Sequence, residues 1–252
     1  MNAYHWDLFW MLTRTEFRMR DQGTWAGFLW TLLHPLFIFA ILYGLFTHWM
    51  SPHVDHYAAY LLIGVIQWNF FATATAAGLT SLLRKAGLVS HYSFPKVLVA
   101  LSSVFAVLMS HLLEWAVLLG ALLLMGLKAR LGWFLLPGLI LVELSLAAGI
   151  SCFLSVAIVH MRDLDRVWNI LLYGLFFLTP VFYTGDVLGP VGRRFVAANP
   201  VGTIIEATRG VVIGGGLSSL GGLLPVAVAA AALCAAGTLM FGRMSRGIVE
   251  KL

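Results

Sequence analysis

Three ionisable side chains lie deep inside long apolar runs of the sequence. An ionisable group at membrane depth is costly enough to suggest a function. His111 and Glu114 are three residues apart, so a helix places both on one face, and Glu143 lies in the next apolar run. Together they could carry protons or other ions across a bilayer. A His–Glu pair can equally bond one helix to its neighbour, because polar side chains bridge helices in membranes. We favour this structural use and keep an ion-coupled secondary carrier as an alternative.

Motifs for nucleotide binding or hydrolysis do not accompany these residues. The sequence contains no GxxxxGK[ST], HExxH or GxSxG pattern, and its glycine clusters lack dinucleotide-binding spacing. Cys152 and Cys234 both lie in apolar runs without a neighbouring ligand set, which favours buried thiols over a metal site or a redox pair. We therefore expect neither a catalytic site nor a metal in this chain, and a membrane-embedded enzyme is disfavoured.

The composition is that of an integral membrane protein. Of the 252 residues, 60% are hydrophobic and 11% are charged, and the mean hydropathy is +0.90. Soluble domains carry about 25% charged residues, so this chain lacks the side chains for a polar surface. The excess of 16 basic over 11 acidic residues is better explained by charges sorted to one side of a membrane than by nucleic-acid binding.

Apolar runs predict about six transmembrane helices, since a crossing takes about 20 helical residues. The runs are 28–50, 57–83, 97–127, 133–159, 167–183 and 220–241, of which 167–183 is the shortest. An even number of crossings places both ends of the chain on one side of the membrane. The predicted fold class is an all-α integral membrane protein.

Basic residues in the breaks between these runs indicate which side that is. Eleven fall on the side of the termini, namely Arg14, Arg18, Arg20, Arg84, Lys85, Lys96, Arg162, Arg166, Arg243, Arg246 and Lys251. Five fall on the other side, namely Lys128, Arg130, Arg193, Arg194 and Arg209. Because basic residues concentrate in cytoplasmic segments, we expect both termini, and the charged cluster that contains Arg162 and Asp163, in the cytoplasm.

Residues 4–21 predict an amphipathic helix in the membrane interface. Four aromatic residues and Thr13 recur at helical spacing, and the charged residues fall on the other side. The first set is Trp6, Phe9, Trp10, Thr13 and Phe17, and the second is Asp7, Arg14, Arg18 and Asp21. We expect the rings at headgroup depth, or the helix packed on a partner, and the two arrangements are compatible.

The connection at 84–95 is too apolar for a solvated basic loop. It fits a short helix on the cytoplasmic face that stops at Pro95. Leu88 and Tyr92 are four residues apart and would share one face of that helix, which suggests insertion into a groove of a partner protein.

Residues 184–219 are too apolar for a plain loop and too interrupted for a span. Proline disfavours helix in the residue before it, so Asn199 should form a corner before Pro200 and could bond backbone groups freed there. Broken backbone at this depth is tolerated where it is buried in protein or lines a water-filled cavity. We predict short re-entrant helices that form a gate on the outer side, in which Arg209 pairs with Glu206 more readily than with a ligand.

In this order, the segments resemble the permease subunits of ABC transporters that export polysaccharides such as O-antigen and teichoic acid. The resemblance runs nearly end to end. It rests on Phe17-Arg18-Met19-Arg20, Gly27-Phe28-Leu29-Trp30, Leu33-His34-Pro35, Ala86-Gly87-Leu88-Val89, Phe94-Pro95-Lys96, Arg162-Asp163-Leu164, Thr179-Pro180-Val181-Phe182-Tyr183, Asn199-Pro200 and Glu206-Ala207-Thr208-Arg209.

The resemblance implies one ABC-2 type transmembrane domain over residues 1–252, in a bacterial inner membrane. It implies two copies of the chain around one channel and two separate ATPase subunits that bind ATP and Mg²⁺, so this chain itself needs no cofactor. The cargo would be a lipid-linked glycan, moved to the outer side. Coupling to the ATPase would involve Arg84, Lys85, Leu88, Tyr92, Phe94 and Pro95.

Further residues are candidates for contact with such a cargo. Rings that could stack on the C–H faces of sugars, or equally fill the core, are Trp30, Tyr43, Phe70, Phe71, Phe176 and Phe177. Arg14, Arg18 and Arg20 could bind a lipid diphosphate or anionic headgroups. The outer gate would comprise Pro180, Tyr183, Asn199, Pro200 and Arg209. An ABC exporter of a small hydrophobic drug is a second alternative.

Overall fold

The computed structural model describes residues 3–21, 25–52, 54–185, 189, 194, 198–214 and 220–248. Within these ranges all regular structure is helical, which confirms the predicted fold class. The elements are α1 (Ala3–Asp21), α2 (Trp25–Met50), α3 (Tyr57–Arg84), α4 (Ala86–His91), α5 (Val97–Leu124), the 3-10 helix η1 (Leu131–Leu135), α6 (Leu136–His160), α7 (Leu164–Leu178), α9 (Pro200–Ile213) and α10 (Leu223–Ile248).

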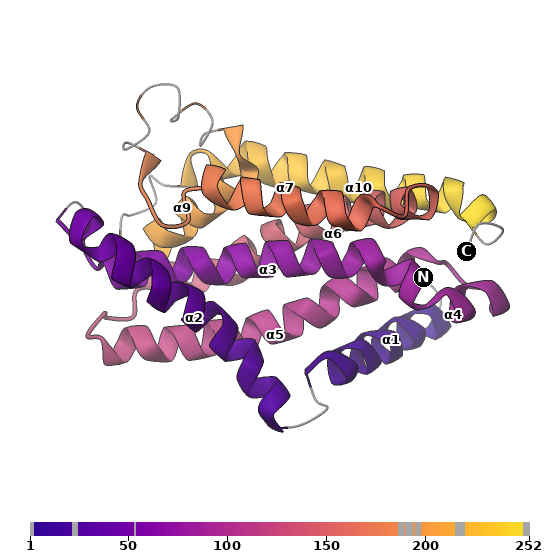
Figure 1. Ribbon diagram of the computed structural model, residues 1–252, viewed down its shortest axis with the longest axis horizontal. Coiled ribbons are helices and arrows are strands. Elements are labelled where there is room, and N and C mark those ends of the chain that lie inside the picture. Colours follow the sequence, from indigo (N-terminus) through magenta and orange to yellow (C-terminus); the bar gives the residue numbers. More distant parts are fainter. Residues whose placement is uncertain are drawn as a thin grey trace.

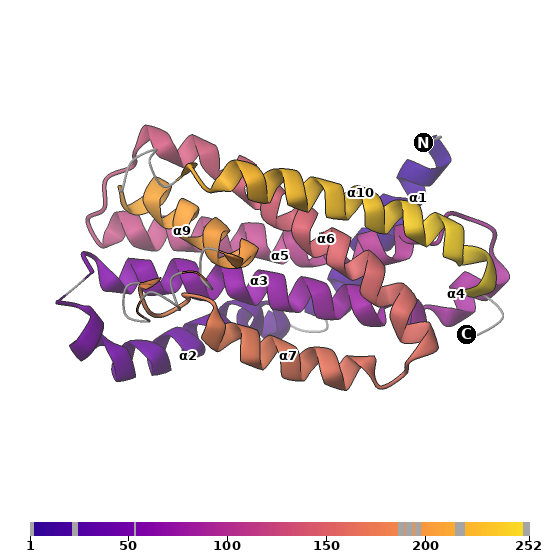
Figure 2. The same ribbon diagram turned by 90° about the horizontal axis from the view of Figure 1, so that it is seen from above.

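Helix α3 is the centre of the bundle. It packs against α5 and α6 on one side and against α2 and α7 on the other, and α10 covers α6 (Figures 1 and 2). Most of α3 is buried within the chain, whereas α2 and the outer face of α7 are largely exposed. In a membrane protein the exposed faces are themselves apolar, as Phe37 and Ile41 of α2 illustrate.

Helices α6 and α10 approach closely because glycines face the opposing backbone. A Cβ on Gly149 would lie 2.7 Å from the backbone nitrogen of Cys234, and one on Gly237 would lie 2.8 Å from the carbonyl oxygen of Gly149. Small residues of this kind let membrane helices pack tightly. Cys152 on α6 is buried, as the sequence predicted, whereas Cys234 on α10 is half-buried.

Five helices in the described part of the chain are long and apolar enough to cross a membrane, one fewer than the six runs predicted. The exception is α7, which has 15 residues and is therefore about 22 Å long, against roughly 30 Å of hydrocarbon. It ends at Leu178, five residues before the predicted boundary, because Thr179 is extended (φ −90°, ψ 137°) in front of Pro180. An irregular segment at 179–183 continues from the end of α7.

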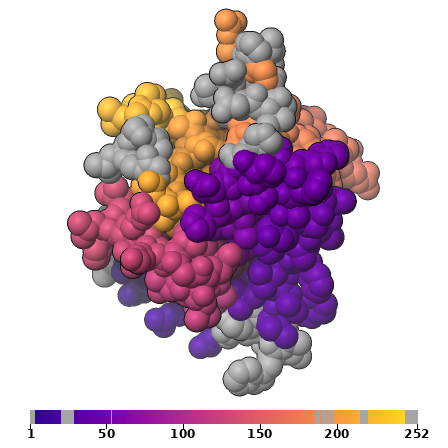
Figure 3. All heavy atoms as spheres, turned by 90° about the vertical axis from the view of Figure 1, so that its left-hand side faces the viewer, coloured from indigo at the N-terminus to yellow at the C-terminus, as the bar shows by residue number. Residues whose placement is uncertain are grey.

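The two ends of the chain lie toward the same end of the bundle as α4 and the connection between α6 and α7 (Figures 1 and 2). This agrees with an even number of crossings. The opposite end carries α9, which lies between the magenta residues near η1 and the purple α2–α3 connection (Figure 3). Helix α9 is bound to η1, because the Trp133 indole of η1 donates to the carbonyl of Val212 at 3.2 Å.

Helix α1 packs on α5 of the same chain, whereas the sequence suggested the membrane interface or a partner as its surroundings. Phe9 and Thr13 are buried, and the Phe9 ring meets that of Phe105 edge-on with centroids 5.1 Å apart. Trp6, expected on the same stripe, is exposed instead. The stripe is therefore divided between a protein contact and the surface.

Candidate functional site

A groove with a volume of about 510 Å³ runs between α2, α3 and α7. Its walls combine aromatic rings with neutral polar groups. The lining residues are His34, Ile38, Val65, Trp68, Asn69, Ala72, Thr73, Ala76, Asn169, Leu172, Tyr173, Phe176 and Phe177. None of these is Asp, Glu, Lys or Arg, so the groove is suited to a ligand that stacks and forms hydrogen bonds without carrying a compensating charge.

Two of the six predicted channel aromatics line this groove, Phe176 and Phe177 of α7. Phe176 packs on Trp68 of α3 with ring centroids 5.8 Å apart. The groove therefore presents aromatic faces from both α3 and α7.

The other four predicted rings lie elsewhere. Trp30 and Tyr43 are exposed on α2 outside the lining of the groove. Phe70 and Phe71 of α3 are buried in the hydrophobic core, and the Phe70 ring stacks on the His111 ring with centroids 4.3 Å apart. The expectation that Phe70 and Phe71 face a channel is at odds with this burial, since both side chains are surrounded by their own chain.

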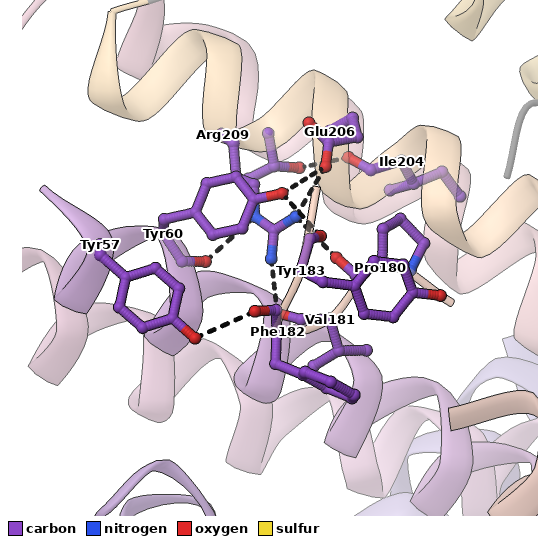
Figure 4. A network of polar contacts seen from close by, with 10 residues as sticks. Tyr57, Tyr60, Pro180, Val181, Phe182, Tyr183, Ile204, Glu206 and Arg209 are labelled. Carbon is purple, nitrogen blue, oxygen red and sulfur yellow. Dashed lines mark hydrogen bonds and ion pairs between the residues drawn. The ribbon is translucent and has the colours of Figure 1, made fainter. Parts of the chain in front are cut away.

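The irregular segment 179–183 that follows α7 is held by Arg209 of α9 (Figure 4). Arg209 is 3% exposed and donates to the carbonyls of Pro180 at 2.7 Å, Val181 at 2.7 Å and Tyr60 at 3.0 Å. Its Nη1 also lies 2.7 Å from Glu206 Oε1. The expected pairing with Glu206 is present, and the guanidinium fork is engaged by three backbone oxygens besides.

Tyrosine hydroxyls bind the rest of the irregular segment 179–183. Tyr57 of α3 donates to the carbonyl of Phe182, and Tyr60 donates to that of Tyr183, each at 3.0 Å. The Tyr183 hydroxyl in turn donates to the carbonyl of Phe177 at 2.8 Å. Irregular backbone at membrane depth is stable when its carbonyl and amide groups form hydrogen bonds within the protein. The segment 180–183 is therefore held in one conformation by side-chain hydrogen bonds and is not a plain loop.

Asn199 forms the predicted corner before α9. Its Oδ1 accepts from the backbone amides of Val201 and Gly202 at 3.0 and 3.2 Å, and its Nδ2 donates to Thr179 Oγ1 at 2.8 Å. An Asn cap followed by proline at the first helical position is a favoured helix start. The cap thereby joins the start of α9 to the end of α7.

All five predicted gate residues lie where α3, the irregular segment 179–183 and α9 meet. They are Pro180, Tyr183, Asn199, Pro200 and Arg209. Of the predicted gate segment 184–219, residues 186–188, 190–193, 195–197 and 215–219 lie outside the described residues.

The three ionisable groups of the apolar runs do not form one site. His111 and Glu114 pair at 3.4 Å, and Glu114 also accepts from Asn69 of α3 at 3.4 Å. The Trp115 indole donates to His111 Nε2 at 2.8 Å, so this nitrogen carries no proton and the imidazole is neutral. The contacts bind α5 to α3, which is the structural use that we favoured.

Glu143 lies in a separate contact between α6, α3 and α9. Its Oε2 accepts from Gln67 Nε2 at 3.3 Å, and the same amide donates to Thr208 Oγ1 at 2.9 Å. In the described part of the chain no group of three or more His, Cys, Asp or Glu side chains is arranged to hold a metal ion. The expectation that Glu143 joins His111 and Glu114 is wrong, because its side chain is engaged by Gln67.

At the other end of the bundle, α4 is shorter than the predicted 84–95. Arg84 is the last residue of α3, Lys85 joins the two helices, and Tyr92 follows α4 in extended conformation. Leu88 is half-buried and Tyr92 is 65% exposed. Beyond α4, Phe94 is half-buried and Pro95 exposed.

Two other predicted charge groups are exposed. Arg162 and Asp163 lie in the connection from α6 to α7, toward the same end of the bundle as α4 (Figure 2). Arg14, Arg18 and Arg20 lie on the exposed face of α1.

Sequence reasoning missed several residues that hold these sites. Tyr60, Gln67 and Asn69 are polar groups within the apolar run of α3, and this interruption was the available signal. Glu16 was also missed, although it follows Phe9 and Leu12 at helical spacing and therefore shares the buried face of α1.

Comparisons with known proteins cover most of the chain. The family described as "ABC-2 type transporter" matches residues 7–213. An O-antigen export system permease protein RfbA of Klebsiella pneumoniae is 25% identical over 217 residues, which are 86% of this chain and 84% of that protein. The O-antigen export system permease protein RfbA of Myxococcus xanthus is 25% identical over 202 residues, 79% of this chain and 78% of the relative.

Proposed function

The chain belongs to the ABC-2 type transporter family, and on this premise we propose that it is the membrane-spanning subunit of a polysaccharide exporter. Its cargo would be a lipid-linked glycan, moved across the inner membrane of a bacterium. Relatives of which more than three quarters align with this chain carry the name of O-antigen export permeases, which supports this class of cargo. Five helices of sufficient length and apolarity support a multi-pass membrane protein.

The observation that carries the proposal is the uncharged aromatic groove between α2, α3 and α7. Sugars present C–H faces, on which rings such as Trp68 and Phe176 stack, and hydroxyls, which Asn69 and Asn169 can bind. A groove of this kind can hold successive sugar units of different identity. A polymer that passes through the groove needs this tolerance. An ion-coupled carrier finds no support in a neutral, structurally engaged His111.

Two copies of the chain would complete the pathway. The groove is open, and exposed apolar side chains flank it on both α2 and α7, such as Ile41 and Ile170. A second copy that covers these faces would turn two grooves into one channel. The aromatic side chains that lie on exposed α2, Trp30 and Tyr43, would then border the same channel.

The energy would come from two separate ATPase subunits, which bind ATP and Mg²⁺, because this chain contains no P-loop. We assign their docking to α4 and the residues beside it, Leu88, Tyr92, Phe94 and Pro95, with Arg84 and Lys85 at its base. The connection with Arg162 and Asp163 lies toward the same end of the bundle and would face the same subunit (Figure 2). This end, with both termini, is then cytoplasmic.

The exposed arginines of α1 and the cluster at the start of α9 mark the two ends of the pathway. Arg14, Arg18 and Arg20 would receive the lipid diphosphate at the cytoplasmic surface. At the outer end, Asn199, Pro200 and the irregular segment Pro180–Tyr183 would form the gate. Arg209 would hold this gate together through its hydrogen bonds to the segment.

Export of a glycan is the test. In cells that lack this chain, a lipid-linked glycan should accumulate on the cytoplasmic side, and the wild-type chain should restore surface polysaccharide. Phe176→Ala combined with Trp68→Ala should lower surface polysaccharide several-fold, whereas Leu239→Ala, on the exposed face of α10, should not. Normal surface polysaccharide in cells without the chain would exclude this function.

A further inference from the structure

Two cations at the junction of α3 and α4 converge on one carboxylate of α1. Glu16 Oε1 lies 2.7 Å from Arg84 Nη2, and Glu16 Oε2 lies 2.7 Å from Lys85 Nζ. The Glu16 and Lys85 side chains are only 9% and 17% exposed, so water screens their bond little, whereas Arg84 is half exposed. The Glu16–Lys85 ion pair is therefore the less screened of the two contacts.

Lys85 is the residue at which the chain changes direction between α3 and α4. It ends α3 and precedes α4, with φ −114° and ψ 27°, outside helical geometry. Its carbonyl accepts from the amide of Val89, the first bond of α4. Fixing the Lys85 side chain therefore limits the direction in which α4 leaves α3.

Other contacts also hold α4 against α1 and α5. Leu12 of α1 lies in the same buried cluster as Val89 of α4 and Val99 of α5. Lys96, at the start of α5, donates to the carbonyl of Val89 at 2.5 Å and holds the other end of α4. Thus α4 is bound at its start by α1 and at its end by α5, although it has only six residues.

We propose that Glu16 is a positioning residue for energy coupling, because it fixes α4 to α1 through Lys85. The inference rests on the proposed docking of an ATPase at α4. Movement of the ATPase then displaces α4 and α1 as one body, and α1 passes the displacement to α5, on which it packs. Without the ion pair, α4 still meets the ATPase but turns at Lys85 instead of moving α1.

The test compares Glu16→Gln with Asp7→Asn, an exposed carboxylate on the same helix. In the complete complex with the partner ATPase, E16Q should retain recovery of the complex and ATP hydrolysis, and should lose most glycan export per ATP hydrolysed. D7N should leave that ratio unchanged.

Hydrogen exchange of the full chain separates a positioning role from simple support of the fold. E16Q should accelerate exchange of the amides of residues 86–91 and leave those of α5 unchanged. This measurement needs no export, so it holds even if the cargo is not a glycan. Should E16Q not insert, Lys85→Gln removes the same bond from the other side and carries the same expectations.

Two results would each overturn the proposal: an unchanged ratio of export to hydrolysis in E16Q, or exchange that rises equally in α1, α4 and α5. The last result would assign Glu16 to the general stability of the chain.

Discussion

The guanidinium carbon of Arg209 on α9 lies 3.4 Å from the centre of the Tyr60 ring on α3. The same two residues are joined a second time, because Arg209 Nε donates to the carbonyl of Tyr60 at 3.0 Å. A cation over a tyrosine face is attracted by the ring, more so when both are withdrawn from water. Helix α9 is thus joined to the central helix α3 by one residue that also binds the irregular segment 179–183 after α7.

Replacing Arg209 by lysine should destabilise the chain severely despite keeping the charge. An ammonium group lacks the planar fork that reaches the carbonyls of Pro180 and Val181 together. Each carbonyl left without a donor costs about 1–3 kcal/mol. Thermal unfolding in detergent should show a clear loss for Arg209→Lys and none for Arg243→Lys at the exposed end of α10. Equal stability of the two variants would contradict the fastening role.

Gly64→Ala should destabilise the same contact from the side of α3. A Cβ at this position would lie 2.4 Å from Arg209 Nη2 and 2.6 Å from the carbonyl oxygen of Val181. Overpacking of this kind costs about 1–3 kcal/mol. The matched control is Gly44→Ala in α2, where a Cβ would meet nothing within 4 Å and a gain of about 0.5–1 kcal/mol in helix propensity is expected. Unfolding midpoints that shift in the same direction would show that the approach of Arg209 to α3 is looser than described.

The double replacement Glu114→Gln and Glu143→Gln should leave export close to the wild-type level. Both carboxylates accept hydrogen bonds from neighbouring helices. A glutamine carbonyl can accept the bond that Glu143 makes, whereas at Glu114 it replaces only one of the two oxygens that face Asn69 and His111, so the cost of the replacement falls on stability. The measurement is surface polysaccharide in cells, normalised to the amount of inserted protein. Abolished export with normal insertion would instead favour transport coupled to ions.

Acid should release the contact between α1 and α4. Burial alone would raise the pKa of the Glu16 carboxyl, but the hydrogen bond with Lys85 and the charges of Lys85 and Arg84 outweigh it and hold the pKa below its ordinary value of 4.5. A carboxyl whose pKa is lower in the folded state contributes stability above its unfolded pKa and loses it as the pH falls through the folded value. The stability difference between wild type and Glu16→Gln should therefore be constant near pH 7 and shrink below pH 4.5. A difference that grows as the pH falls would contradict this sign.

Several features of the site were predictable because they depend on the local chain. The apolar runs gave the positions of the long helices, since a membrane crossing needs little more than length and apolarity. Asn199 before Pro200 predicted the corner and its cap, because proline restricts the preceding residue whatever surrounds it. The same restriction at Thr179, before Pro180, could have predicted the early end of α7.

Other features were decided only when the helices came together. Arg209 binds carbonyl oxygens, which every residue carries, so no pattern of side chains could identify Pro180 and Val181 as its partners. Phe70 and Phe176 look alike in sequence, and only the neighbours of α3 and α7 place one ring against His111 and the other in the groove.

The partner of Glu16 belongs to the same class. Sequence identifies Glu16 as an acidic residue on the buried face of an amphipathic helix, and Lys85 as a basic residue after a span. Their bond depends on how α1 lies against α3 and α5, a contact between segments far apart in the chain. Hydropathy and proline therefore determined where the helices begin and end, whereas packing between them determined which polar groups meet, because each helix can satisfy its own backbone but not its buried side chains.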